Sequence, residues 1–157
     1  MKKILIIIMF FFGCVIKPSI TPYEKYFFKG NKSAKKNVTA TFLGTTTILI
    51  SDGKTSIMTD GFFTRPSMWD LAIGKIEPDT QKIHYALEKA NITNLKAVIP
   101  VHSHHDHAMD APEVAKKTGA ILVGSNSTAN IGLGYGLSEK QILVPKYGEK
   151  IKFGEFF

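Results

Sequence analysis

Residues 95–107, Leu-Lys-Ala-Val-Ile-Pro-Val-His-Ser-His-His-Asp-His, join an apolar run to a dense cluster of histidines. The run from Leu95 to Val101 is short and apolar, which predicts a strand buried on both faces. The pattern His-x-His-x-Asp-His follows it directly, over residues 102–107. Four of the chain's five histidines lie within these six residues. A metal site therefore explains the cluster better than a solvated loop does.

The spacing of the cluster indicates how it binds metal. In extended backbone, residues i and i+2 project to the same side, so the imidazoles of His102 and His104 can reach one ion. A turn can aim Asp106 and His107 at a neighbouring position, whereas His105 is expected to be exposed or to lie behind the ligands. Imidazole with carboxylate suits zinc, and also iron or manganese. Because such ions lower the pKa of bound water to about 7, the predicted chemistry is hydrolysis.

The sequence on both sides of the cluster predicts a mixed α/β fold built in layers. Asp52-Gly53 between β-rich runs is a preferred tight turn. Strands followed by alternating helices and strands indicate layers of helix and sheet. The expected elements are strands over 39–44, 46–50 and 55–59, a loop over 62–74, a helix over 79–90, a strand over 95–101, a helix over 110–119, a strand over 120–123, a short helix capped within 125–128, a loose turn at Gly132, Gly134 and Gly136, a further cap at Ser138, and strands over 142–144 and 150–153.

Two further polar residues near the cluster have structural explanations in the sequence. Asp110 precedes a helix by one residue and is followed by Glu113, which predicts a capping box in which the two side chains bond to each other's backbone. Capping accounts for Asp110, although its position also allows a place near the metal site. His84 lies on the face of its helix opposite Leu87 and is expected at the surface.

Residues 1–16 have the pattern of an export signal. Lys2 and Lys3 precede the apolar run 4–12, and Gly13-Cys14 follows. A membrane span needs about 20 residues, so this run is too short. Cys14 is a candidate for lipidation, and a cleaved signal and an uncleaved anchor remain alternatives. Because Cys14 is the only cysteine, an intrachain disulfide and a thiolate metal site are excluded. We expect an exported protein of the cell envelope, either anchored as a lipoprotein or periplasmic or secreted.

The net charge of +7 belongs to the N-terminal region. Residues 1–36 contain eight lysines and one acid, Glu24, a balance that equals the charge of the whole chain. Residues 17–37 are predicted to form a basic linker, which either lies on anionic lipid or is simply solvated. The remainder is formally neutral, so nothing in it favours nucleic acid as a partner.

Around the cluster the sequence resembles the metallo-β-lactamase superfamily, whose hallmark is the His-x-His-x-Asp-His loop after a buried strand. Phe42-Leu-Gly44 and Thr59-Asp60-Gly61 resemble the opening strands of that fold, and residues 118–124 resemble the segment after the loop. The resemblance covers about residues 38–153. It implies that 38–157 is the N-terminal half of an αββα sandwich.

The resemblance also implies roles for individual residues. His102 and His104 would bind a first zinc ion and Asp106 and His107 a second, with Asp106 also handling a proton. Asp60 would support the site by orienting a ligand; the alternative is that it is only a turn residue before Gly61.

Family members take their remaining ligands, two histidines and an aspartate, from a second half, and residues 108–157 contain no histidine. We therefore expect a truncated chain, which is either part of an enzyme or an inactive, membrane-tethered remnant. The expected substrate is a small or lipid-like molecule with an ester, lactone or phosphodiester bond. The oligomeric state is open, and nucleic-acid processing fits a neutral, exported domain poorly.

Overall fold

The computed structural model describes Ser19, residues 21–26 and residues 38–157. The chain forms two compact units, 1–34 and 35–157. In the first, the described part is a 3₁₀ helix, η1 (Thr21–Tyr26), whose first backbone N–H donates to the Ser19 hydroxyl over 3.2 Å. The predictions for the leader and Cys14 lie outside the described residues. None of the helices in the described ranges is long and apolar enough to cross a membrane.

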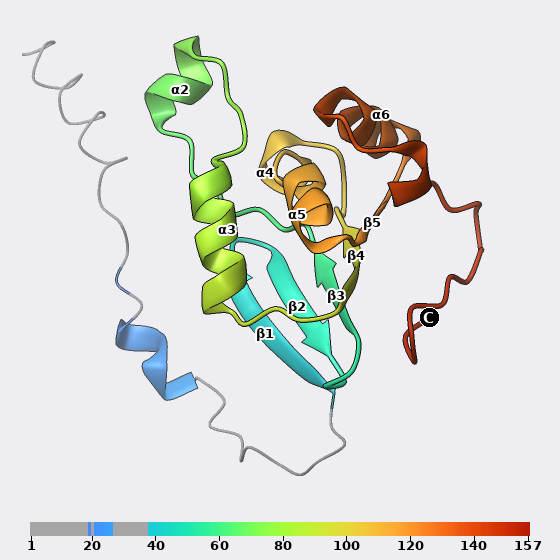
Figure 1. Ribbon diagram of the computed structural model, residues 1–157. Coiled ribbons are helices and arrows are strands. Elements are labelled where there is room, and N and C mark those ends of the chain that lie inside the picture. Colours follow the sequence, from blue (N-terminus) through green and yellow to red (C-terminus); the bar gives the residue numbers. More distant parts are fainter. Residues whose placement is uncertain (1–18, 20, 27–37) are drawn as a thin grey trace, which may run out of the picture. The chain divides into compact units, whose positions relative to one another are not determined.

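The second unit is built on one six-stranded sheet, with its strands in chain order (Figure 1). The first three strands are antiparallel and the remaining neighbours are parallel. The turn after the second strand forms as predicted, because Asp52 Oδ1 accepts the backbone N–H groups of Lys54 and Thr55 and Gly53 takes a positive φ of 84°. The strands are β1 (Thr39–Gly44), β2 (Thr47–Ser51), β3 (Ser56–Thr59), β4 (Leu95–Ile99), β5 (Ile121–Val123) and β6 (Ile142–Leu143).

Helices cover one face of this sheet. The strand register places Leu49, Met58, Val98 and Leu122 in one row across β2 to β5, and all four are buried. They form the core with apolar residues of the helices α3 (Thr80–Lys89) and α5 (Ala111–Thr118). A third helix, α6 (Asn126–Tyr135), packs on β5 and β6. One helical layer on one mixed sheet confirms the predicted α/β class and matches half of a four-layer sandwich.

The opposite face of the sheet is also apolar but is covered less completely. Phe42 and Ile48 are 68% and 37% exposed on this face. Beside them, Ile50, Ile57 and Ile99 line a hollow whose other wall is the C-terminal segment 145–157. This segment contains no strand over 150–153, contrary to prediction, since Phe153 and Phe156 form only an isolated bridge.

Two further predictions about local structure are wrong. The expected loop over 62–74 contains a short helix, α2 (Met68–Ile73), which begins with a capping box between Ser67 and Asp70. The expected turn at Gly132 and Gly134 is instead the second half of α6, and the helix ends at Gly136 in a left-handed conformation. Gly132 packs closely on β5, because a Cβ there would lie 2.7 Å from Leu122 Cδ2. At Ser138 a short 3₁₀ helix, η2 (Glu139–Gln141), does begin, without a hydrogen bond from the serine side chain.

Candidate metal centre

The histidine cluster lies at the end of β4, in the middle of the parallel part of the sheet (Figure 1). The strand ends at Ile99 because Pro100 cannot continue the backbone pairing. The segments that follow β3 and β5 reach the same edge, since carboxyl ends of parallel strands lie side by side. In open α/β sheets this edge is where ligands bind. The topology therefore places the cluster where a site can be assembled from several strands.

Three side chains of the cluster converge. One ligand atom from each of His102, His104 and Asp106 can be chosen so that all lie within 4.8 Å of one another. His102 Nε2 and His104 Nδ1 are 3.1 Å apart. Donors that share one ion at about 2.0–2.2 Å are themselves separated by roughly 3–3.5 Å, so the histidine pair already has a metal-compatible spacing. Asp106, whose side chain is 46% exposed, has room to move closer, and this donor set fits a divalent ion.

His107 lies on the inner side of this group. It is buried, and its ring centroid is 4.0 Å from that of His102. Its Nδ1 is 2.9 Å from Oδ2 of Asp60, which is completely buried. A carboxylate accepts hydrogen bonds, so Nδ1 is placed to donate, and in the neutral tautomer with its proton on Nδ1 the Nε2 atom keeps its lone pair. That Nε2 is 3.7 Å from Asp106 Oδ2, so in this tautomer the two atoms are placed to share a cation.

Asp60 is held in an unusual backbone conformation to make this contact. Its φ is +53°, and the Gly61 N–H donates back to the Thr59 carbonyl over 2.6 Å. Positive φ is uncommon outside glycine, although Asp and Asn tolerate it best. The second carboxylate oxygen accepts the Val101 N–H at 2.8 Å. Asp60 thus joins Val101, the residue directly before the cluster, to the cluster's last histidine.

The structure gives the last part of the cluster a helical form that the sequence did not reveal. A single turn, α4 (His105–Ala108), begins where the His104 carbonyl accepts the N–H groups of His107 and Ala108. This turn buries His107 and leaves His105 exposed. Within the described ranges the His105 side chain makes no hydrogen bond or ion pair, in line with its position between ligands in the motif.

Asp110 has a different role from the predicted helix cap. It is completely buried, and its Oδ2 accepts the backbone N–H groups of Phe63 and Thr64 at 2.7 and 2.6 Å. Its side chain makes no capping bond to α5. Burial raises the pKa of the Asp110 carboxyl, a shift that the two N–H groups partly oppose. The Oδ1 atom has no hydrogen-bond partner among the described residues.

The expected capping partner, Glu113, is also engaged elsewhere. Its Oε1 is 2.6 Å from Nε2 of His84, and its Oε2 accepts the hydroxyl of Tyr135 at 2.8 Å. His84 is therefore not a free surface residue, since its side chain is only 34% exposed. Burial, followed by the hydrogen bond to Glu113, raises the pKa of Tyr135 to about 12. These bonds join α3, α5 and α6 to one another.

Several polar neighbours of the cluster were not identified from the sequence. The Thr46 hydroxyl lies 3.2 Å from His107 Nδ1. The hydroxyl of Ser103, between the paired histidines, contacts the Ser125 and Thr128 hydroxyls. Single hydroxyl residues of this kind carry no sequence signal of their own, because their role depends on contacts across the fold.

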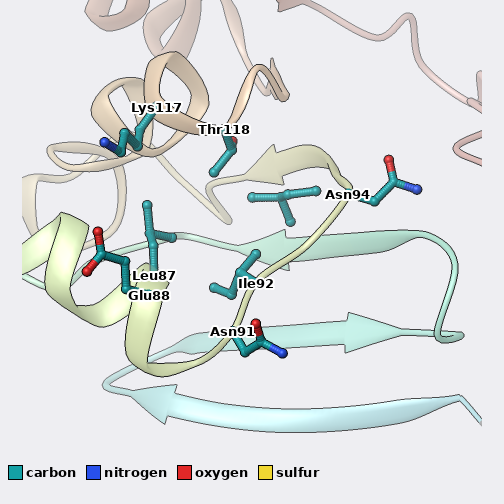
Figure 2. Close-up of a pocket in the computed structure, with 8 residues that line it drawn as sticks. Leu87, Glu88, Asn91, Ile92, Asn94, Lys117 and Thr118 are labelled. Carbon is teal, nitrogen blue, oxygen red and sulfur yellow. The ribbon is translucent and has the colours of Figure 1, made fainter.

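A separate hollow lies at the opposite end of the sheet. It has a volume of about 410 Å³ and lies between the end of α3, the start of β4 and the end of α5. Figure 2 shows Leu87, Ile92 and Thr118 among the side chains around it. Because it lies at the amino end of β4, it is separated from the cluster by the length of that strand.

Comparison with known proteins agrees with the geometry. The sequence profile of the Metallo-beta-lactamase superfamily matches residues 40–153, which confirms the resemblance based on the cluster. A UPF0173 metal-dependent hydrolase of Christiangramia forsetii is 29% identical over 92 residues, covering 57% of this chain and 33% of that protein. One from Heliobacterium modesticaldum is 29% identical over 90 residues, covering 57% of this chain and 31% of that protein. The chain thus spans about a third of the length of these relatives.

Solved structures give similar matches. The metallo hydrolase Igni18 from Ignicoccus hospitalis aligns with a TM-score of 0.47 at 18% identity, over 73% of this chain and 42% of that one. A metallo-beta-lactamase variant from Cronobacter sakazakii aligns with a TM-score of 0.48 at 17% identity, over 73% of this chain and 47% of that one.

Proposed function

Because this chain belongs to the metallo-beta-lactamase superfamily, we propose that it holds a divalent metal ion and serves metal-dependent hydrolysis. The observation that carries the proposal is the convergence of His102, His104 and Asp106 within 4.8 Å. Two imidazoles and a carboxylate are a ligand set that suits zinc, and also iron or manganese.

The proposed roles follow from which atoms keep a free lone pair. His102 and His104 present paired nitrogens at the exposed side of the loop. Asp106 and His107 form a second pair of donors, because Asp60 occupies Nδ1 of His107 and leaves Nε2 free. When bound, a divalent ion lowers the pKa of water towards neutrality and polarises the bond to be broken. Asp106, half-exposed beside these donors, is the residue proposed to accept the proton released as water attacks.

The proposed bond is an ester, lactone or phosphodiester in a small or lipid-like molecule. The support is chemical: each of these bonds has an electrophilic carbon or phosphorus and an oxygen that a cation can polarise. The fold hosts many reactions, so the bond must be identified by assay.

The test is to measure zinc binding and hydrolysis for the wild-type chain and three variants. His104→Ala and Asp106→Ala should each lose hydrolysis of ester, lactone and phosphodiester probes, and His104→Ala should also bind zinc more weakly. His105→Ala is the matched control, because it removes an exposed imidazole from the same loop, and it should retain both properties. Unchanged hydrolysis in His104→Ala or Asp106→Ala would contradict the proposal.

A second proposal is that the chain binds metal without turnover. It is favoured by the spread of up to 4.8 Å among the three donors, which is wider than one shared ion requires, and by the exposure of Asp106. Stoichiometric zinc binding with no hydrolysis of any of the three probes above the metal-free rate would support this proposal over the first.

We also propose that the chain is exported and held at the cell envelope, with Cys14 as the lipidated residue. The support is the basic start, the apolar run 4–12 and Gly13-Cys14. Expression of the chain with and without Cys14→Ser, followed by membrane fractionation and mass measurement, tests this. An unmodified wild-type cysteine would exclude the lipid anchor.

A further inference from the structure

Ser103 lies between the two proposed ligands, and its hydroxyl contacts a different part of the chain from theirs. His102 and His104 meet on one side, where Nε2 and Nδ1 are 3.1 Å apart. On the other side, Ser103 Oγ lies 2.9 Å from Thr128 Oγ1 and 3.1 Å from Ser125 Oγ. The residue between the ligands therefore connects the loop to the start of α6.

The three hydroxyls form a closed ring. The remaining side of the triangle, from Ser125 Oγ to Thr128 Oγ1, is 3.4 Å. Each hydroxyl has one hydrogen to donate and can accept in return, so a ring of three satisfies all of its donors. Thr128 is only 1% exposed. Losing Ser103 would leave its buried hydroxyl with only the longer, 3.4 Å contact to Ser125 Oγ, which makes the contact to Ser103 costly to break.

The start of α6, where Ser125 and Thr128 contact Ser103, is itself bonded to the sheet. Ser125 caps α6 by accepting the Thr128 N–H at 3.3 Å. The preceding Gly124 donates its N–H to the Leu143 carbonyl over 3.1 Å. A Cβ at Gly124 would lie only 2.7 Å from Thr128 Cβ, so the absence of a side chain lets the helix start this close to β5. Ser103 thus bonds to a rigid point rather than to a mobile loop end.

We propose that Ser103 is a positioning residue. Through Ser125 and Thr128 it docks the metal loop, residues 102–107, on the start of α6, and thereby sets the separation of His102 and His104. The inference rests on the proposed function, in which both histidines bind the ion. Loss of the docking lets the loop rotate, and the histidines must be ordered again when metal binds. Partners that orient metal ligands are typically worth about 10–100-fold in metal affinity.

The experiment measures Co²⁺ binding by the full 157-residue chain, using chelator competition for affinity and visible absorption for ligand geometry. Thr128→Val keeps the shape of the side chain and removes the hydroxyl, and Ser103→Ala removes the other end of the contact. Both should weaken binding about tenfold or more and alter the Co²⁺ spectrum. Thr128→Ser retains the hydroxyl and should restore both. Ser127→Ala removes an exposed hydroxyl from the same helix and is the control.

The possible outcomes distinguish the positioning role of Ser103 from the proposed metal-binding function on which it rests. Wild-type affinity and spectrum in Ser103→Ala would overturn the positioning role while leaving metal binding intact. An equal loss in Ser127→Ala would also overturn it, since the effect would then belong to the helix as a whole. Failure of the wild-type chain itself to bind Co²⁺ would instead remove the proposed function. Thermal unfolding of the metal-free variants checks folding, and if Thr128→Val does not fold, Ser103→Ala decides.

Discussion

Replacing Asp60 by asparagine should move the proton on His107. Asp60 accepts two hydrogen bonds, from the Val101 N–H at 2.8 Å and from His107 Nδ1 at 2.9 Å. An amide of the same shape offers one accepting oxygen and one donating nitrogen, so it satisfies only one of these donors. If the oxygen keeps Val101, the amide N–H₂ faces His107. The imidazole must then accept at Nδ1 and carry its proton on Nε2, the atom proposed to bind metal.

The size of the effect follows from the burial of this contact. Asp60 is completely buried, and hydrogen bonds to charged groups contribute about 1.5–3 kcal/mol, compared with about 1 kcal/mol for neutral pairs. We therefore expect Asp60→Asn to lower the free energy of unfolding by roughly 1–2 kcal/mol and metal affinity by about 10–100-fold. Asparagine tolerates the φ of +53° as well as aspartate does, so backbone strain does not confuse the result.

The assay is nitrogen NMR of the histidine rings in the metal-free chain, with metal affinity measured in parallel. The variant should show His107 protonated on Nε2, where the wild type is protonated on Nδ1. Asp52→Asn is the matched control, because it changes an aspartate that accepts backbone N–H groups in a distant turn. If His107 keeps its proton on Nδ1 in Asp60→Asn and metal affinity stays within about twofold of the wild type, the reasoning is wrong.

Three further predictions concern the interior. Because burial raises the pKa of Asp110, the native state binds this proton more tightly than the unfolded state does. The free energy of unfolding should therefore fall as the pH rises above the ordinary value of 3.8 and through the raised pKa. Urea unfolding from pH 4 to 8 should show this loss in the wild type but not in Asp110→Asn. Tyr135→Phe should remove the phenol whose pKa is raised to about 12. It should also lower the free energy of unfolding by about 1 kcal/mol, since the Glu113 carboxylate loses its hydroxyl donor. Ultraviolet titration and urea unfolding check these two effects, and a titration curve unchanged from the wild type would contradict the assignment. Gly132→Ala should destabilise the fold by about 1–3 kcal/mol despite the better helix propensity of alanine, because the methyl group would lie 2.7 Å from Leu122 Cδ2. A thermal midpoint equal to or above that of the wild type would refute the packing argument.

The parts of the fold that could be predicted are those with local causes. The turn at Asp52-Gly53 needs only its own backbone N–H groups, and the helix that starts at Asp79 is capped by that residue's own side chain. The histidine cluster could be identified because its spacing is local too. Even α2 carried a local signal, the Ser67 and Asp70 capping box, which the surrounding loop-like composition hid.

The parts that could not be predicted depend on contacts between distant segments. Asp110 and Glu113 have the spacing of a capping box, but tertiary partners 29 to 47 residues away compete for both side chains. A loose turn was expected at Gly132, yet this residue lies within α6, where it packs so closely that a Cβ would lie 2.7 Å from Leu122 Cδ2. In each case the local preference is worth about 1 kcal/mol, which a buried hydrogen bond or a packing contact can exceed.

The two buried aspartates, Asp60 and Asp110, together hold the metal loop and its neighbouring segment in place in the metal-free chain. Each belongs to one of two neighbouring segments, 60–64 and 101–110, and each is bonded to the other segment. Asp60 accepts N–H groups from both ends of the cluster, including that of His107, and Asp110 accepts two from the far end of 60–64. A buried carboxylate is costly unless hydrogen bonds compensate it, and two N–H donors at each of these carboxyl groups oppose that cost. Because each segment bonds to the other, neither can shift without breaking a hydrogen bond to a buried carboxyl group. The backbone before the cluster and its last histidine, His107, are therefore held in place by the chain itself.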